Sequence, residues 1–350
     1  MEDGAQELSS DEFRRMVDEA VLPKLHDFYT YVAAAGRGPD VVVGRAWGVL
    51  LWDLYGKQYL DMTGGGGPLV LGHCHDAATA GPHAQLPMFS TSAPAGAHVW
   101  FRQVELAKAL SERFPPDRDG MPKQVLFANS GREALLMAAA IGGREINPLP
   151  AAGDFDPGWA AQEAARARKA GFPVVVDETR TGFGRMGSFT AQERLGVEAD
   201  VTVLGETGGG GLPFGAVVAD SALLSKLSQP PFAAGPVVSI AALGVLEQMT
   251  QDMFDYADSL GESLRAGLQE VADQFPDAFA GLRGWGTLRQ LVLAKPRARR
   301  FRDDCLNRGL LVDAPADDVV AFSPALVATE ADVDEAMNVV AEVCMDGGFL

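Results

Sequence analysis

The chain has 350 residues, of which 47% are apolar, so it can bury one large core or two modest ones. Its 47 Asp and Glu against 29 Lys and Arg give a net charge of −18, which makes nucleic acid and anionic membranes poor candidate partners. The acidic, polar N-terminus and the widely spaced Cys74, Cys305 and Cys344 favour a cytoplasmic protein with reduced thiols and no bound metal.

The N-terminal part predicts one helix followed by a small antiparallel unit. Residues 10–35 are predicted to form the helix. Residues 41–62, VVVGRAWGVLLWDLYGKQYLDM, alternate apolar and polar side chains about a YGK turn. This alternation is typical of a meander of short strands.

The next stretch predicts a strand that ends at the start of a helix. A helix over 100–114 precedes the strand QVLFAN (124–129), and SGREALLMAAAIG (130–142) reads as a helix that starts at Ser130. A strand that delivers the chain to a Ser-Gly helix start has an anion-binding geometry, because free backbone N–H groups point away from the helix end.

The remaining predicted strands are continuous apolar runs. PVVVDE (173–178) and DVTVLG (200–205) are expected to be parallel strands covered on both faces, and GAVVAD (215–220) follows as another. A long helical stretch begins near residue 236, and further αβ units run from about residue 250 to the C-terminus. The sequence therefore predicts an α/β protein with a C-terminal subdomain.

Six motifs follow one another along the chain: GVLLWDLYGKQYLDM, LGHCHD, FANSGREAL, VVVDETRTGFGRMGSF, LGETGGGGLPFGAVV and FSPALVATEADVDEAM. In order and approximate spacing, the chain from about residue 20 onward resembles the class III aminotransferases, the pyridoxal-phosphate (PLP) enzymes of fold type I. The resemblance implies a three-layer α/β large domain, a small α+β domain built from both termini, and a homodimer. We place the domains at 1–62, 63–245 and 246–350, and expect a reduced central sheet because the 142–172 connection is short.

The resemblance also implies a role for particular residues. Asp177 matches the aspartate that binds the pyridinium nitrogen, and Ser130 and Gly131 match the helix start that holds the phosphate. Arg132 replaces a small residue beside that phosphate, and Glu206 stands where the family has the Schiff-base lysine. A carboxylate cannot form that imine, so the family's lysine mechanism is not expected from this chain alone.

Two further differences concern the cofactor. The short 142–172 connection lacks the family's stacking aromatic residue, and FAAGPVV (232–238) replaces the TFxGNP loop that supplies a threonine to the partner's phosphate. Together with Arg132 and Glu206, these changes predict that no cofactor is bound, with PLP or pyridoxamine phosphate as the less favoured outcome.

These differences suggest a remodelled site that acts on a small-molecule substrate. Glu206 is expected to pair with Arg180 and to act as acid or base, Arg132 and Arg180 to hold an anionic oxygen, and Asp177 or His73 to carry protons. A cofactor-independent lyase, dehydratase, isomerase or cyclase is the first hypothesis. A non-catalytic subunit that pairs with an aminotransferase-like chain, and an enzyme that uses pyridoxamine phosphate, stay open as alternatives, as does a purely structural role for His73.

Overall fold

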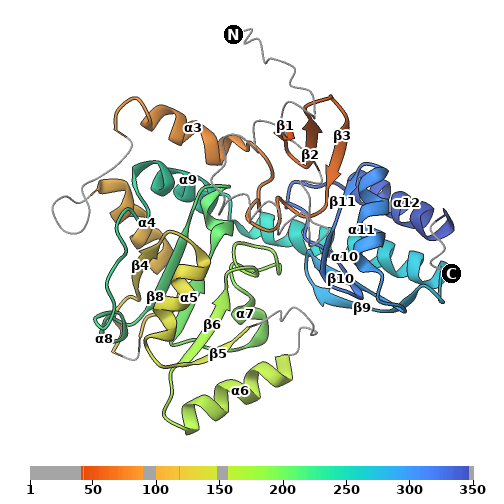
Figure 1. The fold of residues 1–350 in the computed structure, drawn as a ribbon. Coiled ribbons are helices and arrows are strands. Elements are labelled where there is room, and N and C mark those ends of the chain that lie inside the picture. The colour runs from red at the N-terminus through yellow and green to blue at the C-terminus, as the bar shows by residue number, and fades with distance from the viewer. Residues whose placement is uncertain (1–40, 42, 90–99, 118, 148–156, 347–350) are drawn as a thin grey trace, which may run out of the picture.

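The computed structural model describes residues 41, 43–89, 100–117, 119–147 and 157–346 (Figure 1). The helix predicted over 10–35 lies outside the described residues, as do residues 148–156 of the 142–172 connection. In Figure 1 the central sheet and its helices form one body, and the N-terminal strands lie beside the C-terminal elements in a second.

The central sheet has five strands among the described residues, in the order β4-β8-β7-β6-β5. These are β4 (Gln124–Ala128), β5 (Arg144–Ile146), β6 (Val174–Glu178), β7 (Val201–Leu204) and β8 (Gly215–Ala219). Strands β6 and β7 are parallel, as expected, and β5, which was not predicted from the sequence, pairs with β6 in parallel. The expectation that 215–220 is also parallel is wrong, since β8 runs antiparallel to β4 and β7. The connection over 205–214 holds only a short turn, which is too short for a parallel crossover.

Both faces of this sheet are covered, which gives the expected three layers. On β8, Ala216 and Val218 pack into a cluster with α4 (Phe101–Ser111) and α9 (Pro236–Glu247), whereas Val217 and Ala219 pack toward α5 (Gly131–Ala139). This alternation follows from the period of two in a strand. The other helices of this body are α3 (Asp76–Gln85), α6 (Pro157–Lys169), α7 (Ala191–Leu195) and α8 (Ser221–Leu224).

The two ends of the described chain share one core. The predicted meander is confirmed as β1 (Val43–Trp47), β2 (Leu50–Asp53) and β3 (Gln58–Asp61), and β11 (Leu310–Leu311) joins β3 in parallel. Val49, Leu60 and Met62 pack with side chains from residues 260–344. A small α+β unit built from both ends of the chain is therefore present, and its boundaries near residues 62 and 245 stay predictions.

The rest of this unit is a second antiparallel sheet with three helices. The sheet runs β12-β13-β10-β9, built from β9 (Phe279–Trp285), β10 (Leu288–Leu293), β12 (Asp313–Ala316) and β13 (Val319–Phe322). The helices are α10 (Gln251–Gln274), α11 (Ala298–Asn307) and α12 (Glu330–Asp346). Among the helices in the described ranges, none combines the length and the apolar character that crossing a bilayer requires.

Candidate functional site

Several segments of the large body meet at the start of α5, and glycines allow their close approach. A Cβ atom on Gly131 would lie 2.9 Å from Thr179 Cγ2 and 3.0 Å from Gly205 Cα. A Cβ atom on Gly215 would lie 2.2 Å from the carbonyl oxygen of Ser130. The ends of β4, β6 and β7 and the start of β8 thus converge where the sequence predicts an anion-binding helix start.

The carboxylate of Glu206 lies on this helix start. Glu206 opens the short 3-10 turn η1 (Glu206–Gly209) directly after β7, and its Oε1 accepts a hydrogen bond from Gly131 N at 2.9 Å. Ser130 is the N-cap of α5, where its Oγ accepts from Glu133 N at 3.1 Å. The positive end of the α5 dipole therefore faces an oxyanion supplied by the protein itself.

A cavity of about 220 Å³ adjoins this contact. Thr207 is one of its lining residues, and the buried Oγ1 of Thr207 has no hydrogen-bond partner in the described chain. A larger cavity of about 540 Å³ lies between α3 and α9, but no residue of the predicted site lines it. The lining of the smaller cavity is Gly66, Gly67, Pro68, Thr179, Arg180, Arg185, Glu206, Thr207, Leu288 and Ser323.

Asp177 lies at the end of β6, one strand away from Glu206. Its carboxylate is buried and accepts hydrogen bonds from Thr179 Oγ1 at 2.6 Å, Thr179 N at 3.0 Å and Asn147 Nδ2 at 3.4 Å. A carboxylate has about four lone-pair positions, so Asp177 can accept one more donor.

Arg180 and Arg132 do not make the contacts that the sequence analysis predicted for them. Arg180 lines the cavity with Glu206, but no ion pair joins these two described residues, and Arg132 is exposed and does not line the cavity. The buried cation that lines the cavity is Arg185, which donates to the carbonyl oxygens of Ser323 at 3.0 Å and Gly67 at 2.8 Å. Burial, and then the charge of Arg180, lower the pKa of Arg185 to about 10, so Arg185 stays cationic at neutral pH.

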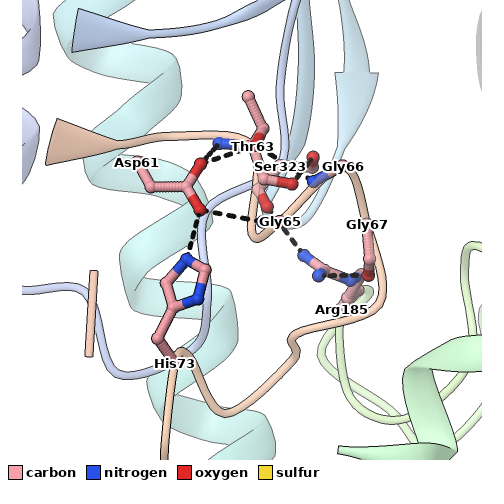
Figure 2. A network of polar contacts seen from close by, with 8 residues as sticks. All are labelled: Asp61, Thr63, Gly65, Gly66, Gly67, His73, Arg185 and Ser323. Atoms are coloured by element: carbon pink, nitrogen blue, oxygen red, sulfur yellow. Dashed lines mark hydrogen bonds and ion pairs between the residues drawn. The ribbon is translucent and has the colours of Figure 1, made fainter. Parts of the chain in front are cut away.

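His73 belongs to the network shown in Figure 2, which holds the glycine loop at the cavity edge and reaches Arg185 through Thr63 and Ser323. Its Nε2 contacts Asp61 Oδ2 at 2.8 Å, and Asp61 also accepts from the backbone N–H groups of Thr63 and Gly65, each at 2.8 Å. Burial acts to raise the pKa of Asp61, but the hydrogen bonds from His73 and Thr63 outweigh it and leave the pKa lowered. His73 is thus brought to Asp61 and not to Glu206.

Sequence reasoning missed Thr207 and Ser323 as residues of the cavity. Thr207 could have been predicted as a cavity residue because its hydroxyl-bearing side chain directly follows Glu206 in the sequence. Ser323 reaches the cavity from the C-terminal unit, and no local pattern marks that contact.

Comparison with known proteins gives consistent results. The model of the family described as Aminotransferase class-III matches residues 31–142 and 152–344. The acetylornithine aminotransferase of Streptomyces coelicolor is 30% identical over 360 residues, which cover 82% of this chain and 87% of that protein. That of Mycobacterium leprae is 27% identical over 366 residues, covering 85% and 89%.

Solved structures agree on the fold. The acetylornithine aminotransferase of Elizabethkingia anophelis superposes with a TM-score of 0.83 at 19% identity, covering 96% of this chain and 99% of that one. The ornithine δ-aminotransferase of Plasmodium falciparum gives a TM-score of 0.79 at 19% identity, covering 91% and 98%.

These relatives correct two expectations. Their names describe amino-group transfer, so the hypothesis of a cofactor-independent lyase, dehydratase, isomerase or cyclase is wrong. The expectation that no cofactor is used is wrong for the same reason, because aminotransferases of the matched class work with PLP. The substitution at residue 206 has to be understood within that chemistry.

Proposed function

Because the chain belongs to the class III aminotransferase family, we propose that it binds PLP beside the start of α5 and takes part in amino-group transfer. The proposed substrate is an amino acid with a terminal amine, of the acetylornithine or ornithine type, as in the names of its relatives. The observation that carries the proposal is the oxyanion held by Gly131 N, which is the contact that a phosphate needs.

The described residues fit the two polar ends of PLP. The α5 start offers Gly131 N and the dipole to a phosphate, and Thr207, whose buried hydroxyl has no partner, lines the same cavity as Glu206. Asp177 retains capacity for one more donor, as a protonated ring nitrogen requires. A buried hydroxyl without a hydrogen-bond partner lowers the stability of the protein. A ligand oxygen that accepts a hydrogen bond from Thr207 would remove this penalty, which agrees with a phosphate bound here.

When bound, PLP supplies an aldehyde that accepts an amino group and a ring that takes up the electrons of a broken C–H bond. Asp177 would hold the ring nitrogen protonated. Glu206 would hold or move a proton beside the reacting carbon, and the exposed Arg180 would bind the substrate carboxylate at the cavity mouth.

The glutamate at residue 206 means that PLP would be bound noncovalently. A carboxylate forms no imine with an aldehyde, so hydrogen bonds and charge alone would hold the cofactor in this chain. Glu206 would therefore leave the cofactor reversibly bound. We further propose a cytoplasmic homodimer, in which the second subunit completes the site.

Equilibrium dialysis against PLP, followed by an assay with acetylornithine or ornithine and a 2-oxo acid, tests the proposal. We expect saturable PLP binding with no lysine adduct after borohydride reduction, and amino transfer that depends on added PLP. Asp177→Asn should weaken PLP binding, and Lys226→Met, which removes an exposed lysine outside the cavity, should leave it unchanged. Absence of both binding and transfer at millimolar PLP would refute the proposal.

A further inference from the structure

We infer that Glu206 is an internal competitor for the anion site at the start of α5. Its carboxylate holds Gly131 N until an incoming phosphate displaces it. The inference deepens the proposed function, since the phosphate in question is that of PLP, but the competition itself applies to any oxyanion.

The geometry places the whole carboxylate against the helix start. Oε1 lies 2.9 Å from Gly131 N, and Oε2 lies 2.8 Å from the position that a Cβ atom on Gly131 would take. Both oxygens therefore occupy the space in front of α5 where a phosphate would bind. No ion pair with a described cation competes for this carboxylate, so the helix dipole and Gly131 N are its main stabilising contacts.

A second observation indicates that the site is built for a larger anion than Glu206. Thr207 lines the same cavity as Glu206, and its buried Oγ1 has no hydrogen-bond partner while Glu206 occupies the helix start. A carboxylate has two oxygens, whereas a phosphate has three or four, and an additional acceptor in the cavity can satisfy the Thr207 hydroxyl. Exchange of one anion for the other would remove an unsatisfied buried donor.

Glu206 is able to leave the helix start. It is half-buried, begins a single 3-10 turn and opens onto the cavity that Arg180 also lines. A displaced carboxylate would therefore stay close to a cation at the cavity mouth. Because only the fraction of molecules with Glu206 displaced can bind phosphate, the apparent affinity is lower than that of the free helix start.

The test measures binding of inorganic phosphate and of PLP to wild type, Glu206→Gln and Glu206→Ala. Isothermal titration gives the affinities, and the amide resonance of Gly131 reports on the contact itself. We expect Glu206→Ala to bind phosphate about tenfold more tightly or more, as loss of a charged hydrogen bond implies. Glu206→Gln should fall between, because its neutral amide oxygen can still accept from Gly131 N.

Glu145→Gln is the matched control, since Glu145 carries the same charge close to Asp177 but does not contact Gly131. It should change phosphate affinity by less than about twofold, as expected for a partly screened charge. Thermal unfolding verifies that each variant is folded.

Equal phosphate affinity in wild type and both Glu206 variants would overturn the inference. An amide resonance of Gly131 whose chemical shift does not change in Glu206→Ala would also overturn it. Tighter phosphate binding without PLP binding in any variant would support the competition and refute the proposed function. PLP binding and amino transfer with equal phosphate affinities would support the function and refute the competition.

Discussion

Arg185 is the largest side chain that is fully buried in the described chain, and it joins three segments through carbonyl oxygens. A lysine has one nitrogen and cannot reach all of these acceptors. We predict that Arg185→Lys lowers the free energy of unfolding by about 3 kcal/mol, measured by urea denaturation. Arg166→Lys, which changes an exposed arginine paired with Glu163, should cost less than about 1 kcal/mol. Equal costs for the two variants would contradict a bridging role for Arg185.

A substitution at Gly131 tests how closely the strand ends pack at the candidate site. An added methyl group would lie within 3.0 Å of Thr179, Gly205 and Glu206, so something must shift. We predict that Gly131→Ala destabilises the protein by about 2 kcal/mol, the usual cost of overpacking. Gly281→Ala is the matched control, because nothing lies within 4 Å of its would-be Cβ atom. If both variants melt at the wild-type temperature, the strand ends have enough free space at Gly131 to accept a methyl group, which would contradict the prediction.

The short helix α7 depends on a carboxylate from β6 as well as on its own capping box. Glu178 is fully buried and accepts from Gln192 N at 2.8 Å, Ala191 N at 3.0 Å and the hydroxyl of Thr181. Burial raises its pKa to about 7, although these hydrogen bonds oppose the shift. The folded state therefore binds a proton that the unfolded state loses at lower pH.

The sign of the resulting pH dependence follows from this shift. The contribution of Glu178 to stability is complete below pH 4.5 and is lost as the pH rises through about 7. We predict that the unfolding free energy of wild type minus that of Glu178→Gln falls over this range in denaturant titrations. Glu163→Gln should show the opposite trend below pH 4.5, because hydrogen bonds from Arg144 and then Arg166 lower the pKa of Glu163. A flat difference for Glu178 would show that it does not titrate in this window.

At the scale of the whole molecule, large apolar side chains are exposed around the ends of α3 and α4. Leu86, Met88, Phe101 and Val104 are 55%, 72%, 64% and 51% exposed. Such a patch is typical of a protein interface. We predict that light scattering at micromolar concentration gives twice the 37.0 kDa chain mass, and that Phe101→Asp shifts it toward the monomer. Met121→Asp changes an equally exposed residue outside the patch and should leave the dimer intact; a monomeric wild type would contradict the proposal.

The sequence predicted the features of this molecule that depend on local pattern. Strands covered on both faces follow from continuous apolar runs such as VVVDE, the three layers were implied by the family resemblance, and the meander follows from the alternation of apolar and polar residues about its turn. Contacts between distant segments could not be predicted in this way. The expected pairing of Glu206 with Arg180 was wrong because the carboxylate accepts a hydrogen bond from Gly131 N. The positions of charged residues in the sequence do not show that Gly131 N lies this close to Glu206. The antiparallel β8 was missed because an apolar run does not encode strand direction.

The parallel pairing of β11 with β3 also bears on how the chain matures during synthesis. Lys57 Nζ donates to the carbonyl oxygen of Asn307 at 3.0 Å, across 250 residues. At about 5–20 residues per second, a ribosome needs on the order of 10–50 s to add the segment between them. Throughout that time the edge of β3 and the apolar side chains of Leu60 and Met62 have no partner from the C-terminal unit. The edge of β3 and this part of the small core can therefore be completed only when translation is nearly finished, which leaves an unpaired strand edge in the nascent chain until then.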